Sequence, residues 1–103
     1  MLRVVETINK ACHLFIARDE DNINIIEFFI GENNLRLTRE EATRILILET
    51  TDFIKFGVVG AAQFWKPENE EPEIMIYFYK EKEIDIIIAP YDEFQMALAE
   101  VLR

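Results

Sequence analysis

The alternation of apolar and polar positions is strongest between Glu73 and Pro90. Two β-rich runs, 74–79 and 84–88, flank the polar segment 80–83, so this stretch predicts a β-hairpin near the middle of a sheet. Because the side chains of a strand alternate between its two faces, one face of the hairpin is expected to be aliphatic and the other aromatic. We expect the remaining elements to pack around this hairpin.

The aliphatic face of the hairpin is suited to a hydrophobic core. In the first strand, Ile74, Ile76 and Phe78 are alternate positions and share one face. In the second strand, Ile84, Ile86 and Ile88 do the same. Met75, Tyr77 and Tyr79 occupy the aromatic face, where the hydroxyl groups require water or a polar partner. Alternation leaves open whether this face is exposed or covered by the N-terminal segment, because it gives only relative sidedness.

The first half of the chain predicts a second hairpin. Residues 12–18 and 23–30 are β-prone and flank the polar tip 19–22. The run 23–30 is apolar at nearly every position except Asn24 and Glu27, which is typical of a central strand that is at least partly covered on both faces. Residues 2–12 fit a broken strand or a helical stripe, and we expect a helix or an irregular start.

Two helices are predicted from their capping residues. After turn residues 31–34 and a short extended piece, Thr38 and Glu41 form a capping box for a helix that is expected to end near Thr51. Asp92 and Gln95 have the same spacing before an apolar stripe that reaches the end of the chain. Between the helices, residues 53–65 predict two strands with a bend at Gly57 and Gly60, and residues 66–73 predict a loop.

These elements predict one α+β domain spanning residues 1–103. We expect a mostly antiparallel sheet of five to seven strands with two main helices packed on one face. A faint similarity between 14–26 and 76–87, each followed by a capped helix, suggests a two-fold hairpin–helix repeat. The segment 35–46 resembles the strand-to-helix step of Whirly and PUR-type repeats, a similarity that implies a layout of sheets and helices and single-stranded nucleic-acid binding.

The charge of the chain bears on its partners. The sequence has 11 Lys and Arg against 20 Asp and Glu, a net charge of −9, and both halves are acidic. Nucleic-acid affinity depends largely on cationic contacts with phosphates, so direct nucleic-acid binding is not expected. The same charge attracts a basic protein partner. With one cysteine, no signal-peptide pattern and no long apolar segment, we expect a cytoplasmic protein without disulfides or a membrane span.

The residues that could carry chemistry are few. Cys12 and His13 are neighbours, and on a strand they would point to opposite faces, which disfavours a shared nucleophile or metal site. Glu81, Glu83 and Asp85 alternate and could hold a cation, but Lys80 and Lys82 are nearby as competing cross-strand counterions. No nucleophile, base and oxyanion donor come together. We therefore expect a protein that is not an enzyme and uses no metal or other cofactor.

Surface features then point to protein binding. Trp65 adjoins an acidic, proline-containing loop, and aromatic side chains ringed by charge are typical of interface hot spots, although Trp65 could equally cap the core. A compact acidic domain of this kind resembles the immunity proteins of contact-dependent growth inhibition systems. The resemblance implies an antitoxin that blocks the active site of a basic toxin, typically a nuclease. The expected contact residues are Asp19, Glu20, Asp21, Trp65, Glu68, Glu70, Glu71 and Glu73.

Two other functions are consistent with the pattern. The Whirly and PUR resemblance implies a module that stacks single-stranded nucleic acid on Tyr77 and Tyr79. An uncovered strand edge would instead allow the domain to associate with itself, and the sequence leaves the oligomeric state open.

Overall fold

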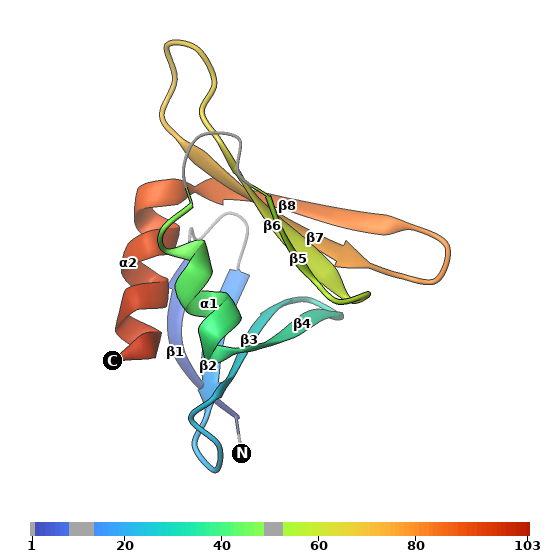
Figure 1. Cartoon of the computed structure of the whole chain (residues 1–103), viewed down its shortest axis with the longest axis vertical. Helices are drawn as coiled ribbons and strands as arrows, with labels where there is room; N and C mark the ends of the chain where they lie inside the picture. The colour runs from blue at the N-terminus through green and yellow to red at the C-terminus, as the bar shows by residue number, and fades with distance from the viewer. Residues whose placement is uncertain (1, 9–13, 49–52) are drawn as a thin grey trace.

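The computed structural model describes residues 2–8, 14–48 and 53–103. Four strands precede a helix in each half of the chain (Figure 1). The first half contains β1 Leu2–Ile8, β2 Leu14–Asp19, β3 Ile25–Ile30, β4 Asn33–Thr38 and α1 Arg39–Ile45. The second half contains β5 Phe53–Phe56, β6 Gly60–Trp65, β7 Glu73–Tyr79, β8 Ile84–Pro90 and α2 Tyr91–Leu102.

The strands form two antiparallel sheets. Their orders are β1-β2-β3-β4 and β5-β6-β7-β8, so each strand pairs with its neighbours in the chain. The α+β class and the antiparallel pairing are confirmed, but the expectation of one sheet with five to seven strands is wrong. Alternation identifies strands and their faces, whereas the sheet that a strand joins depends on contacts between distant segments.

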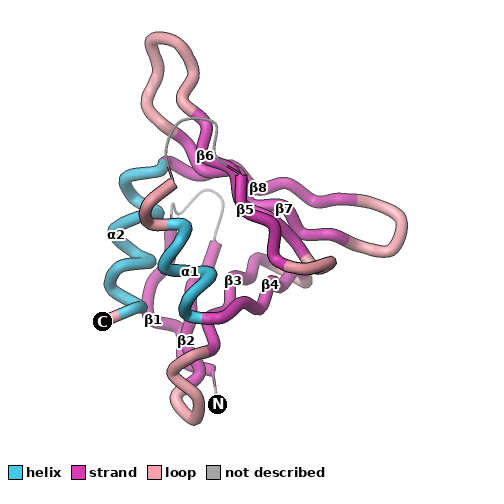
Figure 2. The backbone as a smooth tube through the Cα atoms, in the orientation of Figure 1, coloured by secondary structure: helices cyan, strands magenta, loops and turns pink. Residues whose placement is uncertain are grey.

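One hydrophobic core joins both sheets and both helices. Its fully buried side chains include Phe28 of β3, Leu35 of β4, Ile76 of β7 and Phe94 of α2. The rings of Phe28 and Phe94 meet edge to face at 5.5 Å. Helix α2 contacts β1 and β2 of the first sheet as well as β7 and β8 of the second, and Figure 2 shows both helices on the same side of the molecule. The expected packing of two helices on one face of a single sheet is therefore not confirmed.

The N-terminal segment is a strand, which corrects the expected helix or irregular start. Residues Leu2–Ile8 pair with β2, and the register shifts between Val4 and Glu6. An extra residue in one strand breaks the period-two pattern locally. This irregularity explains why alternation was ambiguous there. Cys12 and His13 lie outside the described residues, as does the expected end of the first helix near Thr51.

The two helix starts differ. At α1, Thr38 Oγ1 accepts a bond from the Glu41 amide at 3.1 Å and the Thr38 amide donates to Glu41 Oε1 at 2.8 Å, which confirms the capping box. At α2, the expected Asp92 and Gln95 cap is wrong, because the chain enters the helix directly from β8 and the N-cap is Pro90. Buried Tyr91 fixes this start, because its hydroxyl donates one hydrogen bond shared between the carbonyl oxygens of Ile45 and Leu46, each at 3.3 Å.

Gly57 and Gly60 have different roles between β5 and β6. Gly57 lies in the turn with φ +54°, a conformation that favours glycine, so the predicted bend is confirmed there. Gly60 is not in that conformation. A Cβ at Gly60 would lie 2.4 Å from the Tyr77 carbonyl oxygen and 2.7 Å from Leu35 Cδ1. Its small size is therefore required by close packing of β6 against β7 and against the first sheet.

The suggested hairpin–helix repeat is not confirmed. The sequence similarity aligned segment 14–26, which holds β2 and the start of β3, with 76–87 of β7 and β8. In the structure, β4 leads into α1 and β8 leads into α2. The sequence alignment would therefore leave β4 without a counterpart.

Candidate binding surface

The side of the β5–β8 sheet that faces away from the core carries several exposed apolar side chains, and we call it the outer face. Strand β7 alternates between half-buried and buried positions, and Ile74, Ile76 and Phe78 are buried as predicted. The cross-strand register then assigns the remaining positions to the outer face. Its members with large or polar side chains are Phe53, Lys55, Gln63, Trp65, Glu73, Met75, Tyr77, Tyr79, Ile84, Ile86 and Ile88.

The isoleucines of β8 correct one expectation. Ile84, Ile86 and Ile88 pair with Tyr79, Tyr77 and Met75, and they are 56%, 48% and 50% exposed. They therefore share the tyrosine face, whereas the sequence had suggested a place in the core. The hairpin also lies at the end of its sheet, not near the middle, because β8 is a terminal strand. Two strands of a hairpin can each be amphipathic, but only their register decides which faces coincide.

The exposed apolar area of the outer face is comparable to that of patches that often bind a partner. Phe53 is 50% exposed and Trp65 is 45% exposed, in addition to the three isoleucines. With roughly 150–250 Å² for each aromatic side chain, half exposure of Phe53 and Trp65 alone leaves on the order of 200 Å² of apolar surface, to which the three half-exposed isoleucines add. The largest apolar patch of a typical monomer covers about 300–600 Å² and is often functional.

Tyr77 occupies the centre of this face. Its hydroxyl donates to Gln63 Oε1 at 2.8 Å, and its ring lies 6.0 Å from that of Phe53. The polar end is thus satisfied within the sheet, and the aromatic group is held in place. Alternation left open whether the N-terminal segment covers the tyrosine face. Strand β1 pairs with β2 of the other sheet, so it does not cover this face.

Formal charge is scarce on the outer face. Lys55 and Glu73 are its charged members, in a chain with a net charge of −9. Glu73 lies opposite Trp65 in the register, and the adjoining loop carries exposed Glu68, Glu70 and Glu71. Five of the eight expected contact residues are therefore close together at one edge of the face. An apolar centre with a charged rim is the usual composition of a protein interface.

The other three expected contact residues are elsewhere. Asp19, Glu20 and Asp21 lie at the β2–β3 turn, at the opposite end of the molecule from the β6–β7 loop (Figure 1). The molecule measures 42 Å along its longest axis. Asp19 accepts a bond from the Asp21 amide at 2.8 Å, which lowers the pKa of Asp19, and it also contacts Arg36 at 3.6 Å. The structure thus divides the expected set into two separate acidic tips.

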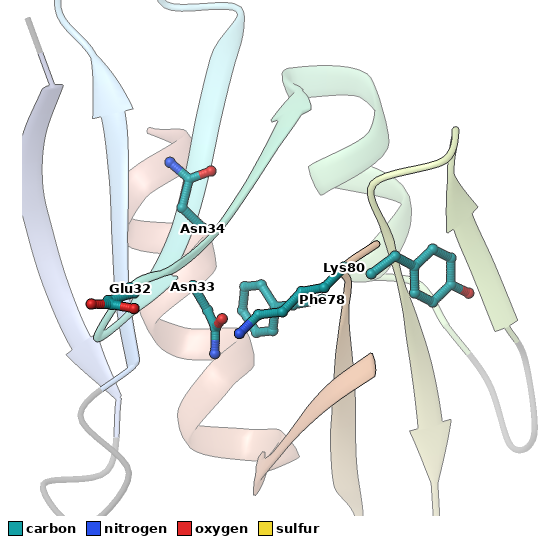
Figure 3. A pocket seen from close by; sticks show the side chains of 6 residues that line it. Glu32, Asn33, Asn34, Phe78 and Lys80 are labelled. Carbon is teal, nitrogen blue, oxygen red and sulfur yellow. The ribbon is translucent and has the colours of Figure 1, made fainter. Parts of the chain in front are cut away.

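A small cavity of about 270 Å³ lies where the two sheets meet (Figure 3). It is lined by Glu32, Asn33, Asn34, Phe78, Tyr79 and Lys80. Figure 3 shows Asn33 and Lys80 pointing toward one another from the two sides. Lys80 Nζ lies 2.7 Å from Asp85 Oδ2 and 3.8 Å from Glu83 Oε1, which confirms Lys80 as a counterion for these carboxylates.

The ion pair beside the cavity lies within the β7–β8 hairpin, and Asn33 of β4 connects it to the first sheet through Asp85. The Lys80 ammonium, followed by the Asn33 amide, holds the pKa of Asp85 below its ordinary value, and Asp85 raises the pKa of Lys80. The charge of Lys80 is thereby neutralised within the protein. The cavity is consequently better described as a polar contact region between the two sheets than as a binding site for an anionic ligand.

Glu27 is a polar residue whose environment the sequence did not predict. It lies on the central strand β3, is only 5% exposed, and accepts a hydrogen bond from Asn34 Nδ2. The sequence signal was a single carboxylate within an otherwise apolar strand. Its side of the first sheet also carries the stacked rings of Phe15 and Phe29, 5.4 Å apart.

In the described part of the chain, no group of three or more His, Cys, Asp or Glu side chains is placed to hold a metal ion. Neither α1 nor α2 has the length and apolar character that crossing a membrane would require. No protein-family model, no curated protein and no solved structure gave a significant match to this chain.

Proposed function

We propose that this protein is an acidic inhibitor that binds a basic protein toxin and blocks its active site, in the manner of an immunity protein. The observation that carries the proposal is the outer face, an apolar and aromatic surface with little formal charge in a strongly acidic chain. Interfaces combine such a centre with a polar rim. A toxin that acts on nucleic acid has a basic active site, which would match the acidic rim.

The two parts of the surface have different roles in this proposal. Trp65 and Tyr77 supply buried aromatic contacts, which commonly provide most of the affinity of an interface. Glu68, Glu70 and Glu71 lie in the exposed loop that follows Trp65 and would occupy positions that the toxin uses for phosphates. Attraction between these carboxylates and a basic partner chiefly increases the association rate. The Asp19–Asp21 tip lies too far away to belong to the same contact.

The test compares matched variants for binding to a basic toxin candidate, beginning with the product of the adjacent gene. Surface plasmon resonance would measure association of Glu70→Lys/Glu71→Lys and of Glu20→Lys/Asp21→Lys at low and high salt. Both double variants change the net charge equally, but only the first alters the rim. We expect the first to slow association at least tenfold at low salt, and the second to have a smaller effect.

Trp65→Ala tests the apolar centre separately. We expect it to increase the dissociation rate at least tenfold, with little change in the association rate, because an aromatic anchor acts mainly after docking. Inhibition of the toxin should weaken in parallel. Equal effects from the two acidic tips together with a silent Trp65→Ala would refute the proposed surface.

The same face supports a second candidate, binding of single-stranded nucleic acid. Tyr77, Phe53 and Trp65 share one open sheet face with Lys55, and bases stack on such aromatic groups. A fluorescently labelled single-stranded oligonucleotide would test this function by anisotropy. Binding that weakens with salt and is lost in Tyr77→Ala would favour it, and no binding at tens of micromolar protein would exclude it.

A further inference from the structure

Strand β8 has an unusual free edge. It is a terminal strand of its sheet, and the β7–β8 hairpin projects away from the helices (Figure 2). Backbone hydrogen bonds at the two ends of β8 show which of its N–H and C=O groups do not bond to β7. The Lys80 amide donates to the Glu83 carbonyl at 2.9 Å, and the Tyr91 amide donates to the Pro72 carbonyl at 3.0 Å. These bonds mark the two ends of the β7–β8 ladder.

Hydrogen-bonded and non-bonded pairs alternate along an antiparallel ladder. Counting from the bonded pair of Lys80 and Glu83, the odd-numbered β8 residues bond to β7, so the N–H and C=O groups of Ile84, Ile86 and Ile88 point to the free edge. A third bond agrees, since the Tyr79 amide donates away from β8, to the Val59 carbonyl at 3.0 Å.

Edge strands are normally protected against pairing with another chain by charge, proline or short length. Strand β4 exposes the polar residues Asn34, Arg36 and Thr38, and β5 has only four residues and exposes Lys55. Strand β8 instead exposes isoleucine at each position whose backbone points outward, until Pro90 ends the strand. Its outward edge therefore lacks the protection that β4 and β5 have.

We propose that β8 pairs antiparallel with β8 of a second copy of this chain, with Ile86 on the two-fold axis. This register places Ile86 opposite Ile86 and Ile84 opposite Ile88, so that every outward N–H and C=O group of these residues has a partner. All three side chains then form apolar cross-strand pairs on one face, the arrangement that stabilises neighbouring strands. On the other face, Asp85 lies opposite Ile87.

Other registers are less favourable. A centre at Asp85 would place two carboxylates opposite each other, which is destabilising. A centre at Ile87 would place Ile84 opposite Pro90, which has no N–H group to donate. A centre between two residues would set an outward residue against an inward one and leave the ladder unpaired. Among the registers centred between Asp85 and Ile87, only the one centred on Ile86 avoids these costs.

One local charge contact fits this register, although the net charge of the two copies opposes their association. The hairpin turn 80–83 has two lysines and two glutamates, and in the proposed register it lies beside the start of α2 in the second copy. Lys82 comes opposite Pro90, next to Asp92 of that acidic first turn. The remaining acidic surfaces of the two copies repel, so added salt should strengthen the association by screening them.

A single strand pair buries less than the area of about 1,200–2,000 Å² found in stable interfaces, so we expect a weak dimer in the micromolar range. The proposal does not depend on the proposed function. Dimerisation through β8 should strengthen with salt, whereas binding of a basic partner should weaken, so the two can fail separately.

Disulfide trapping tests the register. All variants carry Cys12→Ser, because Cys12 is the only native cysteine. In a hydrogen-bonded pair the Cα atoms are about 5.5 Å apart, within the range of about 4.4–6.8 Å that a disulfide spans. Ile86→Cys should therefore cross-link to itself under mild oxidation. Ile84→Cys is the control, since the two copies of residue 84 would be offset by four residues, or about 13 Å.

Sedimentation velocity over 5 to about 500 μM, a range set by the expected weak affinity, tests the association itself. Ile86→Lys should weaken it at least tenfold, because two lysines would meet on the axis. Val58→Lys is the matched control, since Val58 is 85% exposed in the β5–β6 turn and away from the edge. Equal cross-linking of the two cysteine variants, or a monomer throughout the concentration range, would overturn the proposal.

Discussion

Gly60→Ala is the substitution for which the structure gives the sharpest expectation. Gly60 begins β6 and lies where the second sheet meets Leu35 of the first. An added Cβ would lie 2.4 Å from the Tyr77 carbonyl oxygen and 2.7 Å from Leu35 Cδ1. The carbonyl belongs to the backbone of the neighbouring central strand, so it cannot move aside without displacing β7. We therefore expect a marked loss of stability.

The magnitude follows from this overlap. The Tyr77 oxygen would have to retreat by about 0.6 Å to reach even 3.0 Å, and Leu35 is fully buried and cannot rotate into free space. Overpacking of a well-packed core typically costs about 1–3 kcal/mol. With a backbone atom and a buried side chain both displaced, we expect about 3 kcal/mol. At about 4–8 °C for each kcal/mol, the melting temperature should fall by about 12–24 °C.

Urea and thermal unfolding, followed by circular dichroism and Trp65 fluorescence, would measure this change. Gly57→Ala is the control. A Cβ there meets nothing within 4 Å, but φ is +54°, so it should cost only the strain of a left-handed residue, about 1–2 kcal/mol. If Gly60→Ala destabilised the protein no more than Gly57→Ala, close packing between the sheets would not be the reason for this glycine.

Three further predictions test the cap, the ion pair and the core. Thr38→Ala removes one half of the capping box, and urea unfolding should show a loss of about 1 kcal/mol. Asp85→Asn removes the partner of Lys80. The ion pair lowers the Asp85 pKa and raises the Lys80 pKa, so both groups are charged at neutral pH, where the variant should melt at a lower temperature than the wild type. This difference should disappear as the pH falls through the folded-state Asp85 pKa or rises through that of Lys80, and a constant difference would contradict the pairing. Phe94→Ala opens a cavity against Phe28 and should cost about 3–5 kcal/mol by denaturant unfolding, and a loss below 1 kcal/mol would contradict that packing.

The local elements were predictable because their signals are short-range. The Thr38 and Glu41 pair identified the start of α1, and alternation correctly placed Ile74, Ile76 and Phe78 in the core. The first strand was missed because its register shift disturbs the period of two. The start of α2 was missed because burial of Tyr91, and not a capping side chain, determines where that helix begins.

The candidate surface was only partly predictable. Trp65 and the glutamates beside it adjoin in sequence, so their proximity followed from the chain itself. The contribution of Ile84, Ile86 and Ile88 did not, since it depends on the β7–β8 register and on β8 being a terminal strand. The separation of the β2–β3 turn, which carries Asp19–Asp21, from the β6–β7 loop also depends on how the two sheets are arranged.

By itself, the sequence determined the acidic character of this protein, the α+β class, the identity of most strands and the capping of α1. These properties arise from composition and from interactions between residues a few positions apart. Only the tertiary structure decided that the strands form two sheets, that α2 contacts both of them, and that the isoleucines of β8 are exposed. Such features depend on which distant segments share a core, and the pattern of any one segment is compatible with several such arrangements.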